Sequence, residues 1–263
     1  MTRLQILIVS LAAVLFFGIY FGFSTQSLSQ KEFSQSKNLE GIDVNMEEFI
    51  SHSKERLGME VLNSIEWEED FVNSSGDSTD KLEGLKELSG LWFRAGNKPI
   101  AGYYAYAAAD IGNSESSWSI AGTTFASALT DNYEPYVLQF CKQQAVRAFE
   151  NAISINPDKL QHRINLAVTH AELPSQENPM RGVLMLQELE EQFPQEARVP
   201  LAIARLAIKT GQNERAEDRL EQAYALDSAD PDIVCLLAHV YFENGDSRAE
   251  TLSLKCDSLK INN

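Results

Sequence analysis

The sequence has few cysteines and few basic residues. Its 263 residues include only Cys141, Cys235 and Cys256, and they contain no C-x2-C pair or Cys/His cluster. Several disulfides therefore cannot build this fold, and the sequence gives no sign of a zinc site. Lys and Arg number 22 against 38 Asp and Glu, for a net charge of −16. Because the phosphate backbone repels such a chain, we expect no nucleic-acid partner.

Motifs that carry catalysis are also missing. The sequence contains neither a phosphate-binding G-x4-G-K-[ST] motif nor a G-x-S-x-G nucleophile motif. The four histidines, His52, His162, His170 and His239, lie far apart, without a second ligand type at metal spacing. We therefore expect a protein that is not an enzyme and that holds no metal or cofactor.

One long segment lacks charge altogether. Leu4–Phe23 spans 20 residues, enough for a helix of about 30 Å, which matches the core of a bilayer. A cleaved signal peptide has a shorter apolar core, about 7–15 residues, and Gly22-Phe23-Ser24 is a poor cleavage site. We interpret residues 1–23 as a transmembrane anchor, and a removed signal peptide remains the alternative. Arg3 before the segment favours a single-pass protein of a bacterial inner membrane, with its bulk in the periplasm.

The next two segments of the chain differ in amino-acid composition. Residues 24–42 are rich in Ser and Gln and predict a flexible linker. Residues 43–81 carry apolar residues at helical spacing and predict helices that cap the remainder of the chain. From residue 40 to residue 80 there are 12 acidic and 2 basic residues. This run is either a docking surface for a basic partner or a solvated helix face, and we favour the second.

One pattern then recurs along residues 82–263. Its clearest copy joins Trp118-x2-Ala121-Gly122-x2-Phe125 to Ala145-x3-Phe149-x2-Ala152-x4-Pro157. The aromatic position steps through Trp92, Phe125, His170, Ala207 and Tyr241, at intervals of 33, 45, 37 and 34. The small position steps through Ala101, Ala145, Gly182, Ala216 and Ala249, at intervals of 44, 37, 34 and 33. A near-constant interval of about 34 residues is typical of helical repeats.

This pattern resembles the tetratricopeptide repeat (TPR) motif, W-x2-L-G-x2-Y followed by A-x3-F-x2-A and a closing Pro. The resemblance implies an all-α fold, a TPR superhelix (an α-solenoid of antiparallel helix pairs) behind the N-terminal transmembrane helix. The repeats would span residues 82–114, 115–159, 160–196, 197–230 and 231–263.

The resemblance also implies a binding surface, because TPR proteins hold peptides or partner subunits on the inner faces of their first helices. The candidate groove residues are Arg94, Asn165, Arg198, Arg205, Lys209 and His239. Asn165 followed by Arg198 resembles part of the clamp with which some TPR co-chaperones hold a C-terminal carboxylate. Ser119, Thr123 and Ala202 depart from that clamp, so we expect a general basic groove that favours acidic segments.

The second repeat contains an insertion of 11 residues. Phe125 and Ala145 are 20 residues apart, where the motif requires nine. The insertion predicts a second helix from about Pro135 to Ser154, two to three turns longer than its neighbours. Its added residues include a mostly apolar set, Tyr133, Tyr136, Val137 and Phe140. This set either packs on the loop at 174–179 or on residues 43–71, or it forms an interface with a partner or a second copy.

Cys235 and Cys256 fall near the start and the end of the two helices in the last repeat. They either form a disulfide or pack as two small buried residues, and we favour the second interpretation.

Together these features predict a membrane-anchored, non-catalytic TPR protein that mediates protein–protein contacts as a scaffold or assembly module of the cell envelope. Its partners would be a protein or peptide and, through residues 4–23, the membrane; self-association is a further option. The alternative is an exported or soluble TPR co-chaperone that binds peptide C-termini after a signal peptide is removed.

Overall fold

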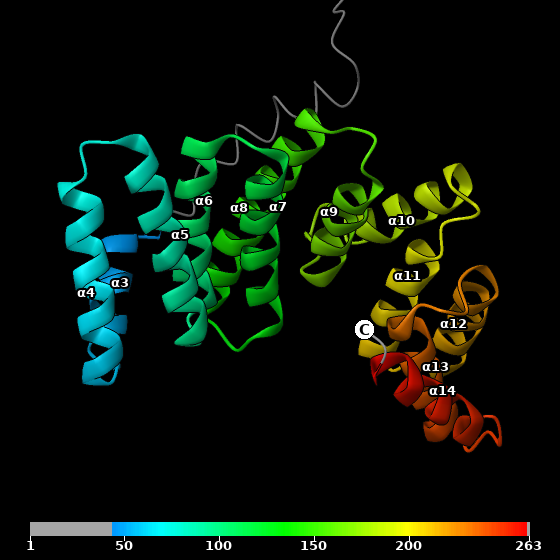
Figure 1. Ribbon diagram of the computed structural model, residues 1–263. Helices are drawn as coiled ribbons and strands as arrows, with labels where there is room; N and C mark the ends of the chain where they lie inside the picture. Colours follow the sequence, from blue (N-terminus) through cyan, green and yellow to red (C-terminus); the bar gives the residue numbers. More distant parts are fainter. Residues whose placement is uncertain (1–43, 262–263) are drawn as a thin grey trace, which may run out of the picture. The chain divides into compact units, whose positions relative to one another are not determined.

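The computed structural model describes residues 44–261, which form twelve α-helices and one short 3-10 helix and contain no strand (Figure 1). The predicted anchor at 1–23 and linker at 24–42 lie outside these residues. None of the helices within 44–261 combines the length and the apolar composition that crossing a bilayer requires.

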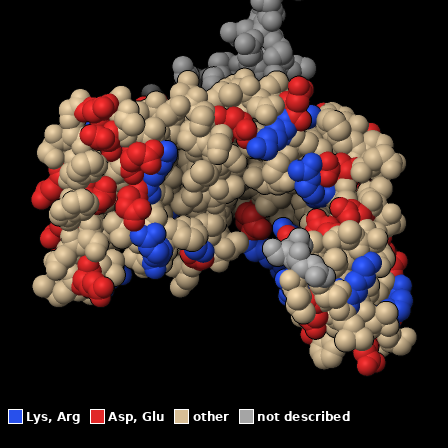
Figure 2. Space-filling view, in the orientation of Figure 1, with Lys and Arg blue, Asp and Glu red and all other residues tan. Residues whose placement is uncertain are grey.

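Two helices precede the helix pairs. They are α3 (Met46–Lys54), which Asn45 caps by accepting a hydrogen bond from the Glu48 amide, and α4 (Met59–Ser74). The ion pair between Lys54 and Glu69 joins them, and Glu69 also accepts a hydrogen bond from Tyr104 of the first pair (3.0 Å). The α4 helix packs along α5 (Ser78–Arg94), the first helix of the pair that follows, so it covers that pair on one side. Acidic side chains predominate where α4 and α5 lie (Figure 2).

Five helix pairs follow, and consecutive helices of the chain pack on each other. The pairs are α5 (Ser78–Arg94) with α6 (Lys98–Gly112), α7 (Glu115–Ser127) with α8 (Pro135–Ile155), α9 (Leu160–Glu172) with α10 (Arg181–Gln192), α11 (Arg198–Lys209) with α12 (Asn213–Leu226), and α13 (Pro231–Glu243) with α14 (Ala249–Ile261).

The repeat positions seen in the sequence occupy equivalent places in these pairs. Each aromatic position lies on a first helix and each small position on a second helix, and all ten are buried: Trp92, Phe125, His170, Ala207 and Tyr241; Ala101, Ala145, Gly182, Ala216 and Ala249. The intervals of the sequence therefore correspond to a repeated packing position.

Three of the five first helices end in the same turn. Gly96, Gly211 and Gly245 have φ values of 82°, 71° and 71°, in the left-handed region that glycine adopts without strain. The following amide in each case bonds back to a carbonyl five residues earlier, as in the bond from Gln212 to Ala207 (2.9 Å). This is a Schellman motif, in which a left-handed glycine ends the helix and turns the chain sharply.

Close helix contacts depend on residues without a side chain. A Cβ on Gly122 would lie 2.7 Å from the Phe149 ring, and a Cβ on Gly102 would lie 2.5 Å from the Phe125 ring. Each of these glycines therefore makes room for an aromatic ring of the next helix, and both rings are buried.

Gly122→Ala is expected to lower the free energy of unfolding by about 1–3 kcal/mol, because the added methyl group overpacks the Phe149 site. Denaturant unfolding of the full chain measures the change. Gly90→Ala is the matched control on α5, since its added Cβ would meet only the flexible end of Arg94. Equal stability of the two variants would contradict the packing argument.

Candidate functional site

The first helices of the third and fourth pairs carry a row of polar side chains. On α9, Gln161 donates a hydrogen bond to Asn165 (2.7 Å) and accepts one from Arg198 of α11 (3.3 Å). At the other end of α11, Lys209 forms an ion pair with Glu172 of α9. Asn165 and Arg198, the two residues that resemble part of a clamp, are thus connected through Gln161.

The row continues onto α13. Arg205 of α11 pairs with Asp232 of α13 (2.8 Å), and His239 is exposed two turns further along the same helix. We call this surface the first-helix face; its predicted residues are Asn165, Arg198, Arg205, Lys209 and His239.

The face is not the basic groove that the sequence predicts. Besides the pairs of Arg205 and Lys209, Arg198 forms an ion pair with Glu196 (2.6 Å). The hydrogen bond from the Arg198 guanidinium lowers the pKa of the Glu196 carboxyl. The first-helix face therefore presents both signs of charge in paired form. The sixth predicted residue, Arg94, lies on α5 of the first pair and is bound to Glu87 of the same helix (2.8 Å).

The long second helix of the second pair is confirmed, because α8 runs for 21 residues from Pro135 to Ile155. The residues before it form a 3-10 turn, Ala128–Thr130, in which Leu129 is buried. Pro135 occupies the first turn, where its missing N–H costs no hydrogen bond.

Most of the apolar set on this insertion is used inside the chain. Val137 is 2% exposed, and Phe140 packs edge to face on Phe125 with ring centroids 5.8 Å apart. The Tyr133 hydroxyl donates a hydrogen bond to the Gly96 carbonyl (3.1 Å), and Phe49 of α3 packs into the same cluster. Of the two interpretations of the set, packing within the chain therefore holds for Tyr133, Val137 and Phe140, and Phe49 is the residue of 43–71 that takes part in it.

Only Tyr136 of that set keeps an exposed side chain, at 51%. It borders a cavity of about 620 Å³ between α3 and residues 132–137, together with Phe49, His52 and Arg56. The predicted interface is therefore corrected: Val137 and Phe140 pack inside the chain. Both belong to one hydrophobic cluster with Leu129 of the 3-10 turn and Phe49 of α3, and repeat spacing does not predict that cluster.

The buried histidines have structural positions. His170 fills the aromatic position of the third pair, and burial, with Arg181 and Lys142 nearby, lowers its pKa to about 3. His162 is hydrogen-bonded to Glu115 of α7, so it links the second and third pairs. Within the described chain, no three His, Cys, Asp or Glu residues are grouped so that they could hold a metal ion.

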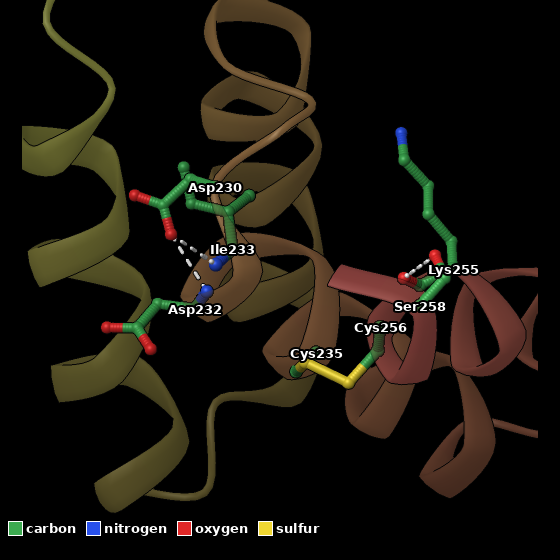
Figure 3. Close-up of a disulfide and its surroundings, with 7 residues drawn as sticks. All are labelled: Asp230, Asp232, Ile233, Cys235, Lys255, Cys256 and Ser258. Carbon is green, nitrogen blue, oxygen red and sulfur yellow. Dashed lines mark hydrogen bonds between the residues drawn. A yellow bond between two sulfur atoms is a disulfide. The ribbon is translucent and has the colours of Figure 1, made fainter. Parts of the chain in front are cut away.

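Cys235 and Cys256 form a disulfide between α13 and α14, with Cα atoms 4.9 Å apart (Figure 3). The favoured interpretation, two unbridged buried residues, is wrong. The start of α13 is fixed by Asp230, whose carboxylate accepts hydrogen bonds from the Asp232 and Ile233 amides. The third cysteine, Cys141, is free and buried, and burial raises its pKa to about 12.

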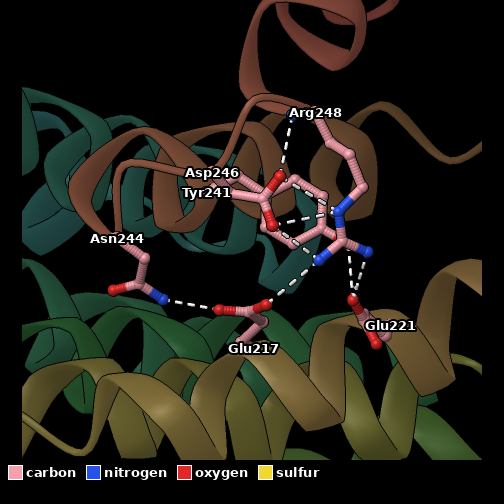
Figure 4. A network of polar contacts seen from close by, with 6 residues as sticks. All are labelled: Glu217, Glu221, Tyr241, Asn244, Asp246 and Arg248. Atoms are coloured by element: carbon pink, nitrogen blue, oxygen red, sulfur yellow. Dashed lines mark hydrogen bonds and ion pairs between the residues drawn. The ribbon is translucent and has the colours of Figure 1, made fainter.

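A polar network ties the turn of the last pair to α12 (Figure 4). The Arg248 guanidinium bonds to Asp246 and Glu221 (2.7 Å each) and lies over the Tyr241 ring, 4.0 Å from its centroid. The Tyr241 hydroxyl donates to Glu221 as well (2.6 Å). These bonds from Tyr241 and Arg248 lower the pKa of the Glu221 carboxyl. The disulfide and this network hold both ends of the α13–α14 pair.

The disulfide can be counted directly. Denatured protein without reductant is expected to show one thiol, from Cys141, and reduced protein three. Reduction is expected to lower the free energy of unfolding by about 3 kcal/mol, because the bridge constrains the unfolded chain between residues 21 apart. Cys141→Ala is the control, since it changes the thiol count and leaves the effect of reductant. Three thiols in both samples would contradict the bridge.

No family model and no curated protein matches the chain. Among solved structures, residues 41 to the end of MamA from Desulfovibrio magneticus RS-1 are similar, at 16% identity and a TM-score of 0.39, over 70% of this chain and 97% of that one. A thermophilic TPR protein from Thermus thermophilus, TTC0263, is similar at 16% identity and a TM-score of 0.44, over 68% and 99%. YrrB, described as a TPR protein with an unusual peptide-binding site, is similar at 14% identity and a TM-score of 0.36, over 68% and 86%. These likenesses concern helix arrangement alone.

Proposed function

We propose that this chain is a non-catalytic module that binds an extended segment of a partner protein on the first-helix face. The observation that carries the proposal is the row of exposed, paired charges along α9, α11 and α13, three first helices of successive pairs. A repeat array offers such a surface at regular spacing, which suits a segment that contacts several pairs in turn.

The pairing of the charges fits this role. An exposed ion pair such as Arg205–Asp232 contributes only about 0–1 kcal/mol to stability. A partner segment can therefore exchange one intramolecular pair for an intermolecular one at little cost. Because both signs are present, the segment would carry acidic and basic side chains in turn, rather than acidic ones alone.

We further propose that residues 4–23 hold the module in the inner membrane of a bacterial cell, as a scaffold of the cell envelope with its bulk in the periplasm. The charge-free Leu4–Phe23 segment supports the anchor. The Cys235–Cys256 disulfide supports the outer side, because disulfides persist in oxidising compartments. Removal of residues 1–23 as a signal peptide would instead give an exported co-chaperone with the same bridge.

Site-specific photocrosslinking tests the binding surface. A photoreactive benzoylphenylalanine in place of His239 is expected to give a discrete adduct with a partner protein in cells, whereas the same group in place of Asp218, exposed on α12, gives none. Adding Arg205→Ala to the His239 substitution should reduce the adduct several-fold, because the partner segment then lacks one charge contact on this face. Equal adducts from both positions, or no adduct from position 239, would contradict the proposal that the first-helix face binds the partner.

Fractionation tests the location. The full chain is expected to stay with membranes after carbonate and high-salt washes, and protease added to spheroplasts should digest the helix pairs. A chain that lacks residues 4–23 serves as the control and should appear in the soluble fraction. Recovery of a mature chain that begins near Ser24 would replace the anchor with the exported alternative.

A further inference from the structure

The α4 helix has a side that carries large apolar groups in solvent. Trp67 is 68% exposed and Met59 73% exposed, although both lie on a helix whose other side is packed. Phe71 stacks on Trp67, with ring centroids 6.1 Å apart and planes 7° from parallel. The indole thus packs on Phe71 and leaves much of its surface free.

A groove of about 490 Å³ lies beside this indole, between α4 and α5. Its walls are Asn63, Ser64, Trp67 and Glu68 of α4 with Glu87 and Leu91 of α5. The groove thus contains an aromatic face, two carboxylates and two neutral polar groups, and its lining residues include no basic side chain.

Glu68 is the unusual member of this groove. Its residue is 7% exposed, yet no hydrogen bond or ion pair joins its carboxylate to any other residue within 44–261. A carboxylate oxygen lies against Gly84 of α5, at a point where a Cβ would stand only 3.1 Å away. The next residue, Glu69, is by contrast bonded to Lys54 and Tyr104.

A carboxylate without a partner at a mostly buried residue loses part of its hydration, which disfavours its charge. Burial, together with the nearby Glu87 carboxylate, raises the pKa of Glu68. A cation that entered the groove would compensate this charge. The surroundings are complementary to a cation as well, since residues 59–94 contain nine carboxylates and three basic side chains.

We propose that this groove binds an arginine side chain of a partner protein, with the guanidinium between Glu68 and Glu87 and its plane along Trp67. Arginine fits better than lysine, because a planar guanidinium can bond to carboxylates and stack on an indole at once. The chain itself provides a precedent, since Glu87 already accepts a hydrogen bond from the exposed Arg94 (2.8 Å). This site lies on α4 and α5 and is additional to the first-helix face.

The proposal is tested by titrating the full chain, in a non-ionic detergent, with the peptide acetyl-Gly-Arg-Gly-Arg-Gly-amide. The indole N–H signals of the tryptophans are followed by NMR, and Trp67→Phe assigns the signal of Trp67. We expect the Trp67 signal to shift and saturate, whereas the signals of the buried Trp92 and Trp118 stay in place. The same peptide with Gln for Arg should cause no saturable shift.

Glu68→Gln is expected to weaken the binding of the arginine peptide about tenfold, which is the usual effect of losing a charge-assisted hydrogen bond. Glu60→Gln, on the exposed side of α4 and outside the groove, is the control with the same change in net charge and should alter binding less than about twofold. Glu87→Gln, at an exposed position, gives a second test that does not depend on how Glu68→Gln folds.

Three outcomes would overturn the proposal. They are equal weakening by Glu60→Gln and by both groove variants, a Trp67 shift with the glutamine peptide, and binding of spermidine as tight as that of the arginine peptide. The last result would indicate a general attraction of cations rather than a site for a protein side chain.

Discussion

The close approach of helices at residues without bulk is the contact on which the rest of the structure depends. Gly102 receives the Phe125 ring, Gly122 receives the Phe149 ring, and Gly182 lies directly on the α9 backbone at Ala171. These contacts fix how far apart consecutive helices lie, and therefore which polar side chains on their outer surfaces come within reach of each other. The ion pairs between α9, α11 and α13 require that spacing.

Close helix packing of this kind can be predicted from the sequence, whereas the ion pairs between helices cannot. The repeated small and aromatic positions, and the extra turns of α8, could be predicted because each position must return to the same helix face after a fixed number of residues. The ion-pair partner of Arg205 could not be predicted. Asp232 lies on another helix pair, and the distance between the two side chains depends on the angle between the pairs. The packing of Val137 and the Cys235–Cys256 bridge were each one of two open alternatives, because repeat spacing does not tell which side chains face each other. The groove at Glu68 is indicated in the sequence only by the acidic run, which is equally typical of a solvated helix face.

The two surfaces differ in how their charges are satisfied. On the first-helix face each predicted Lys or Arg already has a carboxylate neighbour, so binding there exchanges contacts of similar strength. In the groove of α4 and α5, Glu68 lacks such a neighbour within the described chain, so binding supplies a contact that folding does not. The first-helix face therefore suits an extended segment that contacts several helices, whereas the groove suits recognition of one side chain.

The covalent bridge between α13 and α14 also has a consequence for how the array comes apart. In a linear array each pair is stabilised by its neighbours, and a pair with a neighbour on only one side frays first. The last described pair has such an exposed side, with Leu254 and Ile261 in solvent. The bridge fastens α13 to α14, and the Arg248 network fastens their turn to α12. The α13–α14 pair is therefore expected to open less readily than a pair that is held by packing alone.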